Sequence, residues 1–272
     1  MTGARTEIRG RGFLNNEVVA RLAARTGINQ PLVQVFADTV QFAAALISNL
    51  EITKHETSDE KQKVIALVML VRLVEIAESI FILAAYGVRQ DLRSLFRVFL
   101  DAYFLIANIC SDAAFVPVYF GTDVHARLKL MRGAAKRDDE LFKELNEYAT
   151  ADLQSELDRK IKQERVEAFN SFAFAEKVGC GNIYDSMYRI CSASVHTTPR
   201  CLEEYVETDA NDNIVVIIHT GDNESTHRAL SDTQHLLVKA LRGVCEVFAL
   251  KEDAALAALD ARNEAATDDQ RP

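Results

Sequence analysis

Arg189 and His196 stand seven residues apart in the segment YRICSASVHTTPR, residues 188–200, and these two residue types together can cleave RNA. An α-helix turns about 100° per residue, so seven steps return both side chains to one face, about two turns apart. The histidine can accept the proton of a ribose 2′-hydroxyl or give one to the leaving 5′-oxygen. The arginine can stabilise the charge that builds on the phosphate. Because RNA supplies its own nucleophile, this chemistry needs no metal ion.

Two neighbouring residues extend the same helical face. Ser192 lies three positions after Arg189 and four before His196, and Tyr188 continues the stripe. Pro199 ends the helix, which leaves His196 in its last turn, where the helix dipole favours a protonated imidazole. The structural alternative is a histidine that satisfies free carbonyls at a helix end and an arginine paired with a carboxylate. One arginine–histidine pair per chain supplies few catalytic groups. Two copies of the pair that meet across a homodimer interface would make a more complete active site.

A second set of charges lies within the most apolar stretches of the chain. Arg93, Arg97 and Asp101 follow one another in steps of four, which places them on one helical stripe. Charged groups amid apolar residues must pair or line a cavity. Arg93 or Arg97 is therefore a candidate phosphate-binding residue near the Arg189–His196 pair. The alternative, which the pattern favours, is an internal salt-bridge network, for instance that of Arg97 with Asp101 or Glu75.

The remaining histidines do not indicate a metal site. His227 and His235 are eight residues apart with Asp232 between them, and no third ligand of clear spacing lies nearby. We therefore expect no metal and no cofactor. A metal-dependent hydrolase with its ion near these two histidines is the third class to test, and it would lose its activity to a chelator.

Composition favours a helical, cytoplasmic protein. Only 11 glycines and 4 prolines occur in 272 residues, too few for the many turns of a strand-rich fold. The net charge of −9 argues against broad affinity for nucleic acid but allows a local basic site. The five cysteines form no CxxC pair and the N-terminus has no apolar signal segment, so we expect reduced thiols in the cytoplasm. Charges interrupt the apolar stretches 64–88 and 95–110, which predicts buried bundle helices and no membrane span.

Helical periodicity organises most of the chain around one αα-hairpin. The predicted helices cover 30–54, 59–86, 90–111, 122–148, 150–178, a segment from about 183 to 196, and 223–250. The turn between the second and third of these is so short that they must pack antiparallel as the centre of the core. Pro117 and Gly121 predict a break in the chain. The period-two pattern after Pro199 predicts a small β-hairpin insertion near 201–219 in this mainly α fold.

The arginine–six–histidine spacing late in a helical chain resembles the HEPN superfamily, helical bundles with an R-x4–6-H motif near the end of the fold. More narrowly, Y-R-x-x-S-x-x-x-H at 188–196, with GVRQDLRSLFR upstream, looks like an uncharacterised bacterial HEPN-like family. Active HEPN proteins are metal-independent endoribonucleases, often toxins or antiviral abortive-infection effectors, that pair their motifs in a dimer. The resemblance implies a catalytic Arg189 and an acid–base role for His196, with Ser192 and Tyr188 supporting them. Ile190 departs from the polar residue that many active members carry after the arginine.

This resemblance covers about residues 60 to 250 and sets the expected organisation. We expect an N-terminal helical extension over 1–55, a HEPN-like helical domain over 56–250 and an acidic, largely disordered tail over 251–272. The expected function is cleavage of RNA to a 2′,3′-cyclic phosphate by a cytoplasmic homodimer, with a neutralising or activating protein as a further partner. The alternative is a non-catalytic helical module that binds a protein partner or a nucleotide, which the acidic net charge favours.

Overall fold

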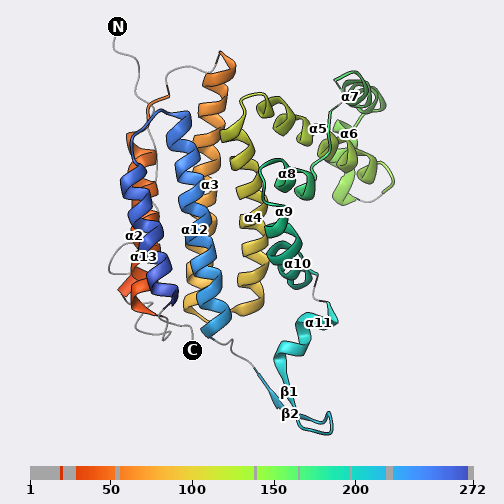
Figure 1. Ribbon diagram of the computed structural model, residues 1–272. Coiled ribbons are helices and arrows are strands. Elements are labelled where there is room, and N and C mark those ends of the chain that lie inside the picture. The colour runs from red at the N-terminus through yellow and green to blue at the C-terminus, as the bar shows by residue number, and fades with distance from the viewer. Residues whose placement is uncertain are drawn as a thin grey trace.

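The computed structural model describes residues 19–20, 29–52, 56–137, 140–164, 166–196, 198–218 and 223–268, which are mostly helical (Figure 1). Its long helices form a bundle of α2 (Gln30–Asn49), α3 (Ser58–Ala85), α4 (Arg89–Ser111), α12 (Asn223–Val247) and α13 (Asp253–Asp268). Their inward faces share one core, in which Phe36, Phe81, Phe99 and Phe104 are fully buried. The remaining elements lie on the α4 side of this bundle (Figure 1).

The central αα-hairpin consists of α3 and α4, as the sequence predicts. Thr57 begins α3 with a capping box, because its hydroxyl accepts from the Glu60 backbone N–H while the Glu60 carboxylate accepts from the Thr57 N–H. Gly87 lies in the turn with φ of 68°, a conformation that glycine adopts without steric penalty. The chain therefore reverses within residues 86–88, and the two helices pack side by side (Figure 1).

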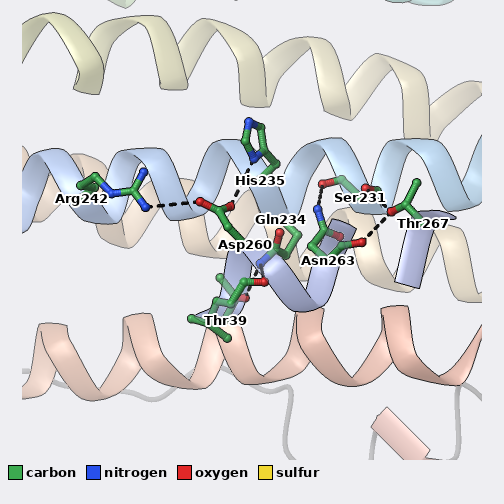
Figure 2. Close-up of polar contacts among 9 residues, drawn as sticks. Thr39, Ser231, Gln234, His235, Arg242, Asp260, Asn263 and Thr267 are labelled. Atoms are coloured by element: carbon green, nitrogen blue, oxygen red, sulfur yellow. Dashed lines mark hydrogen bonds and ion pairs between the residues drawn. The ribbon is translucent and has the colours of Figure 1, made fainter. Parts of the chain in front are cut away.

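A buried polar layer joins α12 to α2 and α13 (Figure 2). The Gln234 amide, fully buried on α12, donates to the Thr39 hydroxyl on α2 at 3.0 Å and to the Leu259 carbonyl on α13 at 3.3 Å. Asn263 on α13 is also buried and donates to the Ser231 carbonyl at 3.1 Å. Because buried amides must find partners, these bonds fix the register of the three helices.

The two flanks of the predicted central domain belong to this bundle. The disorder predicted for 251–272 is wrong for 253–268, which form α13 and bury Leu256, Leu259 and Ala266. Helix α2, expected in an N-terminal extension, packs against α3, α12 and α13 in the same core. Residues 269–272 and most of the first 28 lie outside the described residues.

After α4 the chain forms a further group of helices at one side of the bundle. They are α5 (Phe115–Ala134), the 3-10 turn η1 (Glu140–Phe142), α6 (Lys143–Tyr148), α7 (Ala151–Glu164) and α8 (Ser171–Lys177). The predicted break at Pro117 and Gly121 is wrong, because both residues lie inside α5. Pro117 is the third residue of α5, where a backbone N–H has no helical acceptor in any case. A Cβ on Gly121 would lie 2.6 Å from Val166 Cγ1, so glycine allows the chain before α8 to cross α5 closely.

The last part before α12 carries the motif and the hairpin. Its elements are α9 (Gly181–Ile183), the π-helical stretch η2 (Tyr184–Tyr188), α10 (Arg189–Val195), α11 (Pro199–Leu202), the 3-10 turn η3 (Glu203–Tyr205), β1 (Val206–Thr208) and β2 (Ile214–Ile217). The two strands pair antiparallel and extend away from the bundle below α11 (Figure 1). A mainly α fold with a small β-hairpin is therefore confirmed.

Two bundle helices are long and apolar enough to cross a membrane by length and composition alone. They are α2 and α4, and 56% and 50% of their most apolar windows are buried inside the protein. Both pack against α3 and α12, as core helices of a bundle do. The apolar stretches that the sequence assigned to buried helices are accordingly α3 and α4, with most of their apolar residues in the core.

Candidate functional site

The arginine–histidine motif lies on α10, immediately after a π-helical stretch. The Arg189 backbone N–H bonds to the Tyr184 carbonyl five residues earlier, the spacing that defines a π-helix. A π-helical turn rotates the side chains that follow it, and such turns occur often at functional sites. Helix α10 packs on α4 through Cys191 and Ser194, so its opposite face is open to solvent.

Arg189 is exposed and extends toward the start of its own helix. Its Nη2 lies 3.0 Å from Asp185 Oδ1, and its guanidinium lies 5.9 Å from the centre of the Tyr184 ring. Helical side chains lean toward the N-terminus, which accounts for this direction. With 66% of the Arg189 side chain and 59% of the Asp185 side chain exposed, water screens the ion pair.

His196 is the first residue after α10 and is also exposed. Its φ of −98° and ψ of 4° end the helix. Seven residues of α-helix rise by roughly 10 Å, so the backbones of His196 and Arg189 lie about two turns apart. Since the Arg189 guanidinium points away from His196, one chain alone does not bring the two groups together.

A pocket of about 400 Å³ opens beside the start of α10. Arg189 lines it together with Arg93 of α4 and Arg200 of α11, and Asp185 and Glu204 contribute carboxylates. Of the predicted site residues, the structure thus unites Arg189 with Arg93. It does not place His196, Ser192, Tyr188 or Arg97 in the lining of this pocket.

Glu204 holds the wall of this pocket to the first turns of α4. It forms a close ion pair with Arg93, and it lies 3.4 Å from Arg89 Nε and 3.1 Å from Gln90 Nε2. The Arg89 guanidinium also donates to the Glu204 carbonyl at 2.6 Å. Arg93 is therefore already paired, and a phosphate in the pocket would compete with Glu204 for it.

Sequence reasoning missed three charged residues of the pocket, Asp185, Arg200 and Glu204. Arg200 closes the quoted segment directly after Pro199, so its position beside the motif was an available signal. Glu204 gave no local signal, because its partners on α4 are more than one hundred residues earlier in the chain.

Tyr188 and Arg97 belong to a closed ring of polar contacts beneath α10. Arg97 Nη2 donates to the Tyr188 hydroxyl at 2.8 Å, and the Ser171 hydroxyl lies 3.1 Å from the same oxygen. Ser171 donates to Asp101 at 2.5 Å, and Asp101 lies 3.7 Å from Arg97 Nη2. Since Ser171 gives its one proton to Asp101, the Tyr188 O–H donates to Ser171. The predicted Arg97–Asp101 ion pair is confirmed as part of this ring.

The polar residues on the buried side of α10 are unsuited to nucleophilic catalysis. Burial raises the pKa of the Cys191 thiol to about 11, against an opposing effect of Arg93. A thiol with that pKa stays protonated at neutral pH. Ser192 is half-buried, and its hydroxyl makes no hydrogen bond within the described part of the chain. The remaining cysteines are also unpaired thiols, and Cys110 alone is not fully buried.

The described residues hold no group of three or more His, Cys, Asp or Glu side chains that could bind a metal ion. His227 Nε2 accepts from the Asn29 backbone N–H at 3.2 Å, so that ring is neutral. Burial lowers its pKa below the ordinary value. His235 instead lies 3.2 Å from Asp260, which also accepts from Arg242 (Figure 2). The two histidines therefore serve separate contacts between helices.

The fold and this surface define a helical-bundle protein with a small β-hairpin and an exposed arginine–histidine helix. Residues 63–214, more than half of the chain, match a family of unknown function, DUF5677, and the chain belongs to that family. The matched region contains α3 from residue 63 onward, all of α4 and α10, and the pocket. No curated protein and no solved structure matches the chain.

Proposed function

We propose that this protein is a metal-independent endoribonuclease of the HEPN type, acting as a homodimer in bacterial toxin or antiviral defence. Arg189 and His196 carry the reaction, and RNA is the substrate. Its setting is the cytoplasm, and a neutralising or activating protein regulates it. The proposal rests on the motif and on the exposure of α10.

The observation that carries this proposal is the composition of the open face of α10. Arg189 and His196 are both exposed there, and so are two apolar residues of the same helix, Ile190 and Val195. Ile190 is 62% exposed, which is unusual for an isoleucine in a short helix packed on a bundle. Apolar residues beside reactive polar ones suit a surface that a second chain covers.

A two-fold axis through this face pairs the motif with itself. Two α10 helices related by such an axis run antiparallel, so residue 189 of one copy lies opposite residue 196 of the other. The arginine of each chain then faces the histidine of its partner. This arrangement overcomes the separation of about two turns within one chain, and it yields two composite sites per dimer.

The chemistry follows from the two side chains. Neutral His196 takes the proton of the ribose 2′-hydroxyl, the 2′-oxygen attacks the adjacent phosphorus, and the bond to the 5′-oxygen breaks. Protonated His196 then gives this proton to the leaving 5′-oxygen, so the products are a 2′,3′-cyclic phosphate and a 5′-hydroxyl. Arg189 stabilises the negative charge on the phosphate oxygens during the attack. Its ion pair with Asp185 is exposed and weak, so a phosphate can replace that carboxylate.

Cleavage of labelled RNA in the presence of a chelator tests this proposal. We expect wild-type protein to produce cyclic-phosphate ends, and Arg189→Ala and His196→Ala to lower the rate at least about 100-fold. Arg72→Ala is the matched control, because Arg72 is an exposed helical arginine, 3.3 Å from Glu75, and lies on α3. Equal cleavage by all four proteins would remove the assignment of the two residues.

A complementation assay tests the composite site. Inactive Arg189→Ala and His196→Ala chains are unfolded, mixed and refolded together. A heterodimer then contains one intact site, because one chain supplies the arginine and the other the histidine. We expect about one quarter of the wild-type activity from a statistical mixture. A mixture as inactive as its parents means that each site lies within one chain.

A second candidate function, a non-catalytic module that binds a protein partner, is favoured by the β-hairpin. All four residues of β2, from Ile214 to Ile217, are exposed although all are apolar. A two-stranded sheet also presents unpaired backbone groups along its edges. If RNA is not cleaved under any condition and Ile217→Glu abolishes self-association, the module is the better description.

A further inference from the structure

A groove of about 710 Å³ runs along α5, separate from the pocket beside α10. The exposed side of α5 forms one wall, and Ala168 and Phe169, which precede α8, form the other. Gly121 and His125 hold these walls together, since Gly121 admits Val166 and His125 Nε2 lies 2.7 Å from the Val166 carbonyl. The groove is thus a built feature of the fold.

The α5 wall of the groove is basic at every turn. His125, Lys129 and Arg132 line it at successive spacings of four and three residues, which places them on one side of the helix, and Lys136 lines it just beyond the end of α5. None of the residues lining this groove is acidic. In a protein with a net charge of −9, this concentration of basic residues is a local exception.

Ordinary helix electrostatics explains only part of this row of basic residues. Arg132 forms a close ion pair with Asp158 of α7, and it lies in the last turn of α5, where a cation complements the helix dipole. Lys129 lies more than a turn from the end of the helix and is exposed. Gly133 directly follows Arg132 and lines the same wall, and a Cβ placed there meets no atom within 4 Å. The wall is therefore open as well as basic.

Exposed aromatic rings continue from this groove to the motif. Phe169 lines the groove, and Phe172 follows it on α8; these side chains are 44% and 43% exposed. The Phe172 ring packs edge-on against Tyr184 with centres 5.2 Å apart. Tyr184 in turn lies beneath the Arg189 guanidinium. Aromatic and basic groups thus form one path from α5 to the start of α10.

We propose that this groove, lined by the basic side of α5 and by Phe169, binds single-stranded RNA adjacent to the cleavage site. The inference rests on the proposed function and adds where the substrate strand lies. Lys129, Arg132 and Lys136 contact phosphates, while Phe169 and Phe172 stack on bases. Rows of cations along a backbone with aromatic platforms for bases are how proteins bind single strands without sequence preference.

Gly133 offers a test that leaves the fold intact. Gly133→Glu places a carboxylate in the open groove, and Gly133→Ala is the matched control, because both replace glycine by a better helix former at an uncrowded position. Binding is measured by fluorescence anisotropy with a labelled single-stranded RNA of about a dozen nucleotides. The proteins carry His196→Ala to prevent cleavage. The logarithm of the RNA-binding constant falls linearly with the logarithm of the salt concentration, and each phosphate contact contributes about −0.7 to this slope for a single strand. The phosphate contacts of Lys129, Arg132 and Lys136 therefore predict a slope near −2.

We expect Gly133→Glu to weaken RNA binding about tenfold or more at low salt and to reduce the salt slope, while Gly133→Ala stays within about twofold of the parent. Phe169→Leu, which keeps an apolar side chain but removes the stacking face, weakens binding about fivefold or more. Equal affinities for the Glu and Ala variants overturn the proposal, and so does an absence of RNA binding by the parent.

A short substrate separates this inference from the proposed function. A dinucleotide spans one scissile bond and is too short to reach the groove. With His196 restored, Gly133→Glu is expected to cleave a dinucleotide at the wild-type rate and a longer RNA more slowly. Cleavage of both at the wild-type rate refutes the groove but keeps the nuclease. Binding that depends on Gly133 without any cleavage keeps the groove and refutes the nuclease.

Discussion

Removing the hydroxyl of Tyr188 should lower the free energy of unfolding, because this hydroxyl makes two hydrogen bonds in the ring of polar contacts beneath α10. The Tyr188 side chain is buried, and its hydroxyl accepts from Arg97 at 2.8 Å and donates to Ser171 at 3.1 Å. Tyr188→Phe keeps the ring, its tilted contact with Phe104 and its place beneath the Arg97 guanidinium. The substitution therefore isolates two hydrogen bonds.

The expected loss follows from the kind of each bond. A hydrogen bond from a charged donor contributes about 1.5–3 kcal/mol, and a neutral one contributes about 0.5–1.5 kcal/mol. Arg97 and Ser171 both retain contacts with Asp101, so the combined loss falls toward the lower end, at about 2–3 kcal/mol. For a protein of this size, that loss lowers Tm by roughly 4–12 °C.

Urea unfolding of a double-mutant cycle measures this coupling. The cycle compares wild-type protein with Tyr188→Phe, Ser171→Ala and the double variant, and we expect a coupling free energy of about 0.5–1.5 kcal/mol. Tyr184→Phe is the control. Tyr184 stacks on Tyr188 with ring centres 4.6 Å apart, but its hydroxyl makes no hydrogen bond among the described residues. Its loss should change the free energy of unfolding by less than about 0.5 kcal/mol.

Equal effects of the two tyrosine substitutions would refute the assignment of a structural ring beneath α10. A coupling free energy near zero would leave Tyr188 bonded to Arg97 alone. In the first case α10 would be held by the apolar contacts of the Tyr188 ring, and Arg97 would become a stronger candidate for phosphate binding.

Three further predictions concern other contacts. Asn108→Leu should cost about 1–3 kcal/mol in urea unfolding, because the buried amide donates to the carbonyls of Phe104 and Phe174, and its loss leaves the Phe174 carbonyl without this donor; a loss below about 0.5 kcal/mol would contradict this. Burial lowers the pKa of His227, so the unfolded chain takes up a proton first as pH falls through about 6.5. Stability should therefore drop between pH 7.5 and 5.5, and less steeply in His227→Gln; identical slopes would argue against a neutral buried ring. Asp185→Asn should raise RNA cleavage about two- to fivefold by freeing Arg189, with Glu75→Gln as an exposed control on α3 that changes nothing.

The sequence predicted those parts of the fold whose signals are local. The α3–α4 hairpin followed from the short turn between two predicted helices, and the residues that shape the helix ends, Thr57 and Gly87, lie within a few residues of those ends. Helix α13 also had a local signal that was overlooked. Leu256, Leu259, Asn263 and Ala266 recur at spacings of three, four and three, the pattern of a buried helical face. The many polar residues of this tail led instead to a prediction of disorder.

Other features could not be predicted because they depend on packing. The residues of η2 would continue an ordinary helix by their propensities, and only the fit of Tyr188 against Arg97 and Phe104 distinguishes the π-helical path. The direction of Arg189 depends on that turn. Helical spacing predicted that Arg189 and His196 share one face, and both residues are exposed, but it could not show that the Arg189 guanidinium points toward Asp185.

Polar contacts more than apolar burial hold α10 in place. The helix itself buries only Cys191 and Ser194, two small side chains that remove little apolar surface from water. Its two ends are fixed by the ring around Tyr188 and by the ion pairs of Glu204 with α4. Substitutions in these networks should therefore displace the motif before they unfold the bundle, whose core lies in other helices. A loss of activity at Glu204 with an unchanged Tm would show this separation, whereas a parallel loss of both would mean that α10 and the bundle fold as one unit.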